Sequence, residues 1–435
     1  MKVLLGRHSF STLMKVEHSI WFDSYLYGLS AVFALAASLW SSIPLYREWG
    51  KMALWAYLAA FVFSVLLAKT KKLSTRISAR CWLAGLLVIG AVVIPMALEI
   101  SSRWSGDTQA LHVQPEVVVV EHAAHQVVLG HDPYQARMDH GVLIGRIPGW
   151  PAYEAFFPYL PAMTLFGYPS QAPIPRGLGD ARVWFFLTTA LAVAMALWWL
   201  PVGSRRRLRA LQVVMVMPWA ALTMATGGDD LPIIALLLVA VVLTARRHPL
   251  WAGLVLGLVS SMKFTAWPLT ILLLFAARDS DDQRRPGIMA TAIAGVSIPL
   301  VIVTLIANPK TFIANVVAFP LGLSGVASPA GSALPGHIFV SLVPSSHRIF
   351  PVVCALVGIA YLIGWMRRHR PSTVSEICRL AGWILLIAIA LAPATRVGYL
   401  MYPLNFFVWS WMLSKPTTDE LLSENCLLGP YSAAA

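Results

Sequence analysis

Leu231-Pro-Ile-Ile-Ala-Leu-Leu-Leu-Val-Ala-Val-Val-Leu-Thr-Ala-Arg-Arg247 indicates most directly what kind of protein this is. The stretch is apolar up to the two arginines at its end, and similar apolar runs recur along the whole chain. A helix of about 20 apolar residues crosses the hydrocarbon core of a bilayer. Of 435 residues, 58% are hydrophobic and only 12% charged, whereas soluble domains carry about 25% charged residues. We therefore exclude a soluble enzyme, a disordered chain and a repeat solenoid, and predict an all-α, polytopic transmembrane bundle.

The net charge of +13, from 33 basic and 20 acidic residues, raises the question of nucleic-acid binding. The basic residues, however, stand in short clusters between apolar runs: Lys69, Lys71, Lys72, Arg76 and Arg80; Arg205, Arg206, Arg207 and Arg209; Arg246 and Arg247; Arg367, Arg368 and Arg370. The positive-inside rule assigns such short basic connections to the cytoplasm. Topology and lipid headgroups therefore explain the charge, and we expect membrane lipids but no nucleic acid as partners.

Candidate spans follow from the apolar runs. They cover 24–44, 52–68, 81–99, 183–201, 210–226, 231–245, 286–306, 349–366, 376–393 and 397–414. The stretch 251–277 needs a different treatment, because as one helix it would place the arginines that follow outside and reverse every later basic cluster. We expect it to split near residues 263–268 into two short helices, with non-helical backbone between them that is buried in protein or lines a cavity.

The predicted sidedness divides the chain into three parts. Residues 1–23 form a cytoplasmic N-terminal segment, 24–414 the multi-span domain and 415–435 a cytoplasmic tail. Two long loops, 100–182 and 307–348, then face outward together with short turns at 227–230 and 393–396. These outer loops hold Asp, Glu, His, Tyr and Pro, whereas the cytoplasmic connections are short and basic. We therefore expect the chemistry on the outer face of a multi-pass protein in the plasma membrane.

An interfacial helix is predicted over 116–129, where apolar residues recur at helical spacing. Pro115 suits its first turn and Gly130 its C-terminal stop. Glu116 then lies near the positive end of the helix dipole, where a carboxylate stays ionised and can act as a general base. It can equally be a first-turn acid that only stabilises the helix, and Asp107 and Glu121 compete with it as candidates.

Metal and nucleotide-sugar sites are weakly indicated. His112, His122 and His125 have no fourth ligand at a suitable spacing, so we expect no metal cofactor. Asp279 and Asp281 form a D-x-D pattern, but they lie between arginines in a short cytoplasmic turn and are interpreted as a solvated loop. The Pro-rich stretch 157–175 is too broken to span, and we expect it to pack over a cavity. Four scattered cysteines indicate no disulfide framework.

The ordered motifs resemble the membrane-embedded GT-C glycosyltransferases, specifically the polyprenyl-phosphate-sugar-dependent, mannosyltransferase-like family 87. The elements that carry the resemblance are Glu116 before Ala123-Ala124, Gly130-His-Asp-Pro-Tyr134, Tyr159-Leu-Pro161, Gly227-Gly-Asp-Asp-Leu-Pro232, Trp251-Ala-Gly-Leu-Val-Leu-Gly257 with Lys263 and Pro268, Phe319-Pro-Leu-Gly322, Pro335-Gly-His337 and Ala392-Pro-Ala-Thr-Arg396. Two features depart from the family's pattern. Its usual aspartate is a glutamate here, and two additional predicted spans, 24–44 and 52–68, precede the span that this residue follows.

The resemblance implies transfer of mannose, arabinose or another sugar from a polyprenyl monophosphate to a lipid-linked or glycan acceptor, with inversion, in cell-envelope biosynthesis. Glu116, alternatively Asp107, is the expected base. Arg396, Lys263 and His337 are the expected partners of the donor phosphate, although Lys263 can instead cap carbonyls and His337 can be a surface residue. Expected substrate contacts come from Glu121, Tyr134, Tyr159, Asp229, Asp230 and Tyr399; the last can also be an interfacial-belt aromatic.

A secondary transporter, or a flippase for lipid-linked sugars, is the alternative function. Many spans and a broken helix with an embedded lysine would serve transport as well. Matching halves with paired interruptions are not evident in the sequence, however. The two hypotheses predict different arrangements. In an enzyme, the loops 100–182 and 307–348 would cover one outer site together, whereas in a transporter the polar residues would lie between repeats at the bilayer midplane.

Overall fold

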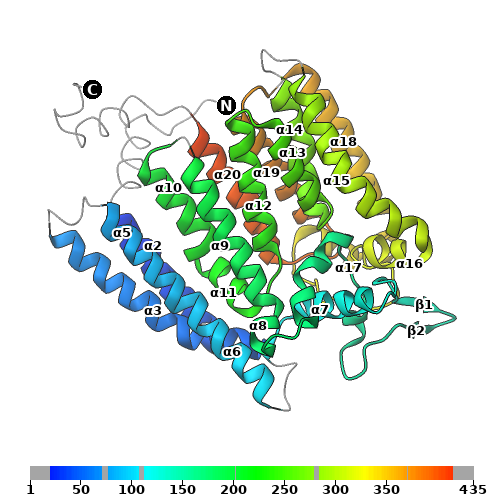
Figure 1. Ribbon diagram of the computed structural model, residues 1–435, viewed down its shortest axis with the longest axis horizontal. Helices are drawn as coiled ribbons and strands as arrows, with labels where there is room; N and C mark the ends of the chain where they lie inside the picture. Colours follow the sequence, from blue (N-terminus) through cyan, green and yellow to red (C-terminus); the bar gives the residue numbers. More distant parts are fainter. Residues whose placement is uncertain are drawn as a thin grey trace.

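The computed structural model describes residues 20–70, 77–106, 112–200, 202–278, 284–369 and 371–414 (Figure 1). Asp107, the D-x-D at 279–281 and the tail 415–435 lie outside the described residues. Within the described part of the chain, one two-stranded hairpin accompanies the helices: β1 (Arg137–Asp139) pairs with β2 (Val142–Ile144) in antiparallel register. The prediction of an all-α polytopic bundle is confirmed.

Among the described residues, seven helices are long and apolar enough to cross a membrane. They are α2 (Ile20–Trp40), α3 (Pro44–Lys69), the continuous helix Ile77–Ser105 made of α5 (Ile77–Val88), η1 (Ile89–Val93) and α6 (Ile94–Ser105), α9 (Ala181–Trp199), α15 (Arg285–Ala307), α18 (Ile349–Arg368) and α19 (Val374–Leu391). An eighth candidate is bent by 46°, between α10 with η6 (Ser204–Leu211 and Gln212–Val216) and α11 (Pro218–Thr226).

Short apolar helices fill the centre of the bundle. They are α12 (Asp230–Ala245), α13 (Pro249–Ser260), α14 (Trp267–Arg278) and α20 (Met401–Leu413). The predicted split of 251–277 is confirmed, since the chain leaves α13 at Ser260 and re-enters helix through the turn η7 (Phe264–Ala266). At 1.5 Å per residue, a 12-residue helix is about 18 Å long, well short of the roughly 30 Å hydrocarbon core.

Close packing of α13 against α15 depends on two glycines. A Cβ on Gly253 would lie 2.6 Å from the Met289 carbonyl oxygen, and one on Gly257 would lie 2.9 Å from that of Ile293. Their spacing of four residues gives α13 a smooth face that admits a neighbouring backbone, as in membrane helix pairs generally. The Gly-rich character of this half-helix is therefore a packing feature.

Several helix boundaries differ from the sequence-based spans, and the starts of α3 and α20 show the reason. Helix α3 begins at Pro44 instead of 52, because its first turns carry charged side chains that hydropathy excludes; Lys51 and Glu48 pair there at 2.7 Å. Helix α20 begins at Met401 instead of 397, because Val397–Leu400 forms the 3₁₀ turn η10. In both cases the apolar run and the helix do not start at the same residue.

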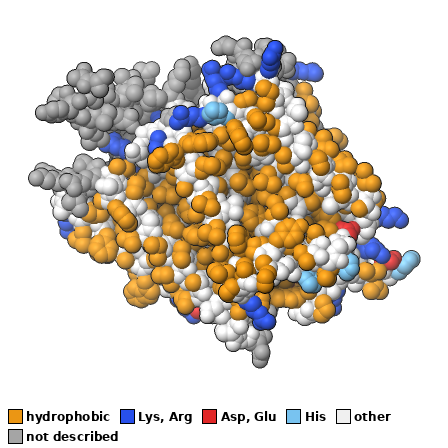
Figure 2. Space-filling model, in the orientation of Figure 1, with side chains coloured by type: hydrophobic (Ala, Val, Ile, Leu, Met, Phe, Trp, Pro, Cys, Tyr) orange, Lys and Arg blue, Asp and Glu red, His pale blue; other side chains and the backbone are white. Residues whose placement is uncertain are grey.

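The basic clusters gather at one end of the bundle. Arg206 Nη1 donates to the carbonyls of Met412 at 2.9 Å and Ser414 at 2.8 Å, and Arg246 Nε donates to that of Trp199 at 2.7 Å. These bonds hold the ends of α9, α10, α12 and α20 together. Figure 2 shows Lys and Arg side chains along its upper edge and hydrophobic side chains across the middle of the same face. This end is the one that the positive-inside rule assigns to the cytoplasm.

The opposite end carries a layer built from the two long loops (Figure 1). The first loop supplies α7 (Pro115–Val128), the hairpin, the 3₁₀ turns η3 (Ala152–Ala155), η4 (Pro161–Phe166) and η5 (Tyr168–Gln171), and α8 (Arg176–Gly179). The second supplies α16 (Pro309–Ile313), η8 (Ala314–Ala318), α17 (Pro335–Leu342) and η9 (Pro344–Ser346). The predicted helix at 116–129 is thus present as α7.

Buried Asn315 joins the two loops. Its Oδ1 accepts from Phe157 N at 2.9 Å and its Nδ2 donates to Ala136 O at 2.7 Å. Phe156 and Phe319 stack beside it with their ring centroids 4.6 Å apart. The loops therefore contact one another over the bundle, the arrangement expected of an enzyme in which both loops enclose one site.

Candidate functional site

The first turn of α7 is anchored to the bundle by Gln114, the residue before the helix. Its backbone N donates to Thr226 O at 3.2 Å, and its side-chain amide donates to Thr226 Oγ1 at 2.5 Å and Tyr46 OH at 3.2 Å. Pro115 occupies the first helical position, where a missing N–H leaves no bond unmade. Together these features fix the position of Glu116, the next residue, against the ends of α3 and α11.

The turn from α11 to α12 brings two aspartates to the same place. Gly227 has φ +107, a conformation that favours glycine, and a Cβ there would meet the Val117 side chain at 2.4 Å. The turn therefore packs tightly on α7, and the charge of Glu116 acts on Asp229. Asp229 is 1% exposed, and Asp230 opens α12.

Lys263 stands at the break between α13 and η7 and faces these aspartates. Its Nζ lies 2.7 Å from Asp229 Oδ1 and 2.5 Å from Asp230 Oδ1. The non-helical backbone around it is satisfied by the first outer loop, because Leu160 N donates to Met262 O and Ala162 N to Ser261 O, both at 2.9 Å. Irregular backbone inside a membrane protein requires such partners. The break is therefore stabilised by hydrogen bonds from the first long loop.

Tyrosines surround this ion cluster. Tyr402 OH donates to Asp230 Oδ1 at 2.9 Å, and the Tyr159 ring lies beneath Lys263 Nζ with its centroid 5.1 Å away. Tyr399, in η10, lies close enough for the charges of Lys263 and Glu116 to act on its hydroxyl. Tyr134 takes a different place: it is fully buried, and its hydroxyl donates to Tyr159 O at 2.9 Å, which orients the loop.

Arg396 reaches Glu116 from the far end of the sequence. The turn that carries it is pinned by the second outer loop, since Thr395 N donates to Ala330 O at 2.8 Å and Ser332 N to Thr395 O at 2.9 Å. Nδ1 of His337 lies 2.8 Å from the carbonyl oxygen of Pro393 in the same turn. His337 thus holds the turn through one ring nitrogen, and its other ring nitrogen has no hydrogen-bond partner among the described residues.

Glu116 and Arg396 form an ion pair between Oε1 and Nη1. The Glu116 side chain is 12% exposed and that of Arg396 29%. Glu116 Oε2 is buried and, within the described residues, has no hydrogen-bond partner. A buried carboxylate oxygen normally has one. The ion pair therefore orients the carboxylate through Oε1 and leaves Oε2 without a partner among the described residues.

Glu154 is a further carboxyl group that the sequence analysis did not single out. It lies in η3, which packs on α7, it is 5% exposed, and its Oε2 is buried without a partner among the described residues. Burial first, and then the charge of Glu116, raises the pKa of Glu154 to about 7. The Tyr-Glu pair at 153–154 between apolar residues was its only signal in the sequence.

Glu154→Gln should stabilise the protein above neutral pH. A glutamate whose pKa is about 7 when folded and about 4.5 when unfolded binds its proton more tightly in the folded state. Stability then falls as the pH rises from 4.5 through 7, by up to about 3 kcal/mol for this group. We expect the variant to melt at a higher temperature than wild type at pH 8, with the difference shrinking at pH 5.

Thermal melts of purified protein at both pH values measure this difference. The matched control is Glu48→Gln, which removes an exposed glutamate and should leave the pH dependence of melting unchanged. Identical pH dependence in wild type and Glu154→Gln would show that Glu154 does not bind a proton in this range.

Glu121 lies in a separate buried network. Its Oε2 receives Arg103 Nη2 at 2.8 Å, its Oε1 accepts from Ala181 N at 3.0 Å, and Arg103 Nη1 reaches Asp180 Oδ2 at 2.7 Å. Arg182 completes the network with a bond from Nε to Asp180 Oδ1 at 2.8 Å. Glu121 is thus not brought together with Glu116, and its contacts are those that fasten α7 to α6 and α9.

A sequence model of glycosyltransferase family 87 matches residues 157–393, more than half of the chain. The chain belongs to glycosyltransferase family 87. The matched region contains Tyr159, the aspartates 229 and 230, Lys263 and His337, whereas Glu116 and Arg396 lie outside it. The resemblance inferred from the motifs is confirmed.

Comparison with solved structures adds a distant likeness to this family 87 chain. The crystal structure of ArnT from Cupriavidus metallidurans bound to undecaprenyl phosphate is similar at 12% identity with a TM-score of 0.46, over 79% of this chain and 62% of ArnT. The alignment thus spans less than two thirds of the ArnT chain. No curated protein matches this chain significantly in sequence.

The charge balance of this cluster is acidic. Among the described residues, four carboxyl groups face two cations: Glu116, Glu154, Asp229 and Asp230 against Lys263 and Arg396. Within the described part of the chain, no three His, Cys, Asp or Glu side chains are placed to hold a metal ion together. His112, one of the three histidines considered as ligands, instead lies 2.9 Å from Glu99 Oε2.

Proposed function

We propose that this family 87 protein transfers a sugar from a polyprenyl monophosphate donor to a lipid-linked or glycan acceptor, with inversion, at the outer face of the plasma membrane. The observation that carries the proposal is the Glu116–Arg396 pair, in which a fixed carboxylate with one unpartnered buried oxygen stands beside a guanidinium. Family membership supports the reaction class. Mannose is the first sugar to test, because the motif resemblance is to mannosyltransferase-like members.

Glu116 is the proposed base. The acceptor hydroxyl donates to Oε2; its oxygen attacks the anomeric carbon as its proton passes to that carboxylate oxygen. The bond between the anomeric carbon and the phosphate oxygen breaks in the same step, and polyprenyl phosphate leaves with the electron pair. One displacement on the opposite face inverts the anomeric centre. The carboxylate needs no covalent role, so a single positioned oxygen is sufficient.

Arg396 is the proposed partner of the leaving phosphate. Before reaction its charge is shared with Glu116; when that carboxylate takes the proton, it becomes neutral. The guanidinium then interacts more strongly with the phosphate, which gains negative charge at the same moment. Such an interaction is stronger in the transition state than in the ground state, the condition for lowering the barrier. The ion pair therefore couples proton transfer to departure of the leaving group.

Lys263 receives a different role from the one expected of it, whereas His337 keeps its expected role. Lys263 is already neutralised by two aspartates, so we propose that it positions Asp229 and Asp230 toward the sugar hydroxyls and does not bind phosphate. His337 keeps a ring nitrogen available and remains a proposed phosphate contact. Tyr159 and Tyr399 border the same cluster and are proposed sugar contacts. We also propose that no metal takes part, since a monophosphate leaving group does not require one.

Transfer of radiolabelled sugar in isolated membranes tests the proposal. Membranes that contain the protein should form labelled lipid or glycan from mannosyl- or arabinosyl-phosphoryl polyprenol, with and without EDTA, and control membranes should not. Label released only as free sugar would indicate hydrolysis. No transfer from any donor, together with solute or lipid-linked-sugar movement in proteoliposomes, would contradict the proposal and favour transport.

Arg396→Gln should reduce transfer by about 10²-fold, the effect of removing one preorganised charge-stabilising donor. The reason is that the amide leaves both Glu116 and the departing phosphate without a cation. Arg396→Lys should recover part of the rate because it restores the charge without the planar fork. Rates are measured at saturating donor. The control, Arg348→Gln, removes an exposed arginine of the second outer loop and should transfer at the wild-type rate; equal rates in Arg396→Gln and wild type would refute the role.

A further inference from the structure

Carboxyl oxygens without a partner gather at one place in the molecule. Among the described residues, three carboxyl oxygens are buried without a hydrogen-bond partner: Oε2 of Glu116, Oε2 of Glu154 and Oδ2 of Asp229. All three belong to the acidic cluster of the candidate site. Buried polar atoms normally have a partner, so each such atom requires an explanation. Glu116 and Asp229 already have proposed roles in the reaction, whereas Glu154 has none.

The turn η3 is held in place without the side chain of Glu154. Glu154 N donates to Pro151 O at 3.0 Å and Phe156 N to Tyr153 O at 3.4 Å, which closes the turn. Phe156 then stacks on Phe319 of the second long loop. The Glu154 carboxyl group, in contrast, makes no hydrogen bond or ion pair within the described part of the chain. The backbone therefore fixes where this carboxyl group lies, and the carboxyl group takes no part in fixing the backbone.

A carboxyl group at this position costs stability. Glu154 is 5% exposed, and burial together with the charge of Glu116 raises its pKa to about 7. A buried acid that lacks both a cation and a hydrogen-bond partner is destabilising when ionised. The fold alone therefore gives no reason for a glutamate here. Residues that lower stability are common where the activity depends on them.

The surroundings of Glu154 place it on the acceptor side of Glu116. Among the described charges, that of Glu116 acts on Glu154, whereas those of Arg396 and Lys263 do not. Arg396 is the proposed partner of the leaving phosphate, and Lys263 holds the aspartates proposed for the donor sugar. In an inverting displacement, the acceptor approaches from the face opposite the leaving group. A side chain near Glu116 but away from both cations therefore has the position of an acceptor contact.

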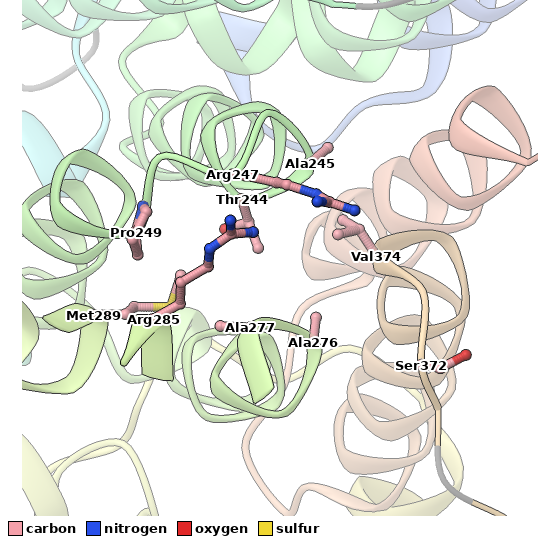
Figure 3. Close-up of a pocket in the computed structure, with 10 residues that line it drawn as sticks. All are labelled: Thr244, Ala245, Arg247, Pro249, Ala276, Ala277, Arg285, Met289, Ser372 and Val374. Atoms are coloured by element: carbon pink, nitrogen blue, oxygen red, sulfur yellow. The ribbon is translucent and has the colours of Figure 1, made fainter. Parts of the chain in front are cut away.

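The cavity drawn in Figure 3, of about 160 Å³, lies at the other end of α12. Thr244 and Arg247 are among the residues that line it, whereas the acidic cluster includes Asp230, the first residue of the same helix. At 1.5 Å per residue, α12 holds Thr244 about 20 Å from Asp230. A group bound in this cavity cannot contact Glu116, so the cavity has no part in holding the acceptor.

We propose that Glu154 binds the acceptor by holding a second hydroxyl group beside the one that Glu116 deprotonates. This inference rests on the proposed transferase function and specifies the acceptor as a carbohydrate or other polyol with neighbouring hydroxyl groups. A carboxyl group suits the task in either protonation state, because it accepts from a hydroxyl group when ionised and donates to one when protonated. Contacts with two hydroxyl groups orient the attacking oxygen better than one contact does.

Initial rates of transfer by the purified full-length protein test the role of Glu154. The donor is radiolabelled mannosyl-phosphoryl polyprenol, and the acceptor probe is solubilised membranes of source cells that lack the gene, added in increasing amounts. Glu154→Met removes the carboxyl group at similar length. We expect the half-saturating amount of acceptor membranes to rise about tenfold or more, the effect of losing one hydrogen bond to a charged group. The half-saturating donor concentration should stay at the wild-type value.

Three measurements separate acceptor binding from folding. Glu154→Met should melt at or above the wild-type temperature at pH 8, since it removes a buried acid without a partner. Glu154→Gln should recover most of the acceptor dependence, because an amide still bonds to a hydroxyl group. Glu48→Met is the matched control: it removes an exposed glutamate and should keep the wild-type dependence on both substrates.

The possible failures of this experiment are distinguishable. No transfer by wild type would overturn the proposed function and this inference together. Transfer by wild type with the same acceptor dependence in Glu154→Met would refute the role of Glu154 alone. A higher half-saturating donor concentration in Glu154→Met, with unchanged acceptor dependence, would overturn the acceptor assignment and place Glu154 on the donor. An equal shift in Glu48→Met would also refute the contact, because the effect would not be specific to Glu154.

Discussion

Glu116→Gln should lower sugar transfer by about 10²- to 10⁴-fold, the range that general-base catalysis contributes. The amide has nearly the same shape and can still contact Arg396 through its oxygen, but it cannot take a proton. We therefore expect the loss to fall on the maximal rate, with little change in the apparent affinity for donor. Initial rates with radiolabelled donor in membranes of matched protein content measure both quantities.

Two variants control the Glu116 experiment. Asp139→Asn changes a half-exposed carboxylate of the β1–β2 hairpin in the same loop and should transfer at the wild-type rate. Asp107→Asn tests the other carboxylate that the sequence predicts as a possible base. Loss of transfer in Asp107→Asn with full activity in Glu116→Gln would move the base to Asp107. Retention of transfer in both variants would show that neither carboxylate is the base.

Lys263→Met should destabilise the protein by about 3–5 kcal/mol, the usual effect of removing one member of a buried ion pair. The Lys263 side chain is 10% exposed and its ammonium is shared by Asp229 and Asp230, so the variant leaves two buried carboxylates without a cation. Lys51→Met is the matched control, because Lys51 pairs with Glu48 on an exposed helix face and should matter by less than about 1 kcal/mol.

Size-exclusion chromatography after heating gives the melting temperatures of these variants. Adding Asp229→Asn to Lys263→Met should recover part of the loss, since it removes one of the unpaired charges. If Lys263→Met keeps the wild-type melting temperature but needs far more donor for half-maximal transfer, then Lys263 binds the donor phosphate and its proposed positioning role is wrong. The two readouts therefore distinguish a cation that holds the fold from one that holds the substrate.

The broken helix could be predicted from the sequence only in part. The positive-inside rule, applied to the basic clusters on either side of 251–277, predicted two short helices, and the structure has α13 and α14 with the break at Lys263. The chain segment that satisfies the exposed backbone, Leu160 to Ala162, lies about a hundred residues earlier and could not be predicted. Its contact depends on how the first outer loop packs, which no local pattern encodes.

Glu121 and Glu154 show that the sequence does not specify which carboxyl groups lie at the site. Glu121 shares a helix with Glu116, and the sequence nominated both; only the tertiary structure places Glu121 on Arg103 in a network away from the ion pair. Glu154 has no distinguishing motif, yet the packing of η3 on α7 buries it within reach of the charge of Glu116. The helix period relates neighbours along a helix, but it does not specify which loop will cover each face.

The sequence by itself determined the all-α membrane fold, its main spans, the split helix, the helix at 116–129 and the family, because apolar length, basic clusters and ordered motifs are properties of contiguous residues. The tertiary structure alone decided which charges meet. Glu116 and Arg396 are 280 positions apart in the chain, and Lys263 is more than 30 positions from its aspartates. An ion pair stabilises or reacts only at contact distance, so its partners depend on how the two outer loops fold over the short helices.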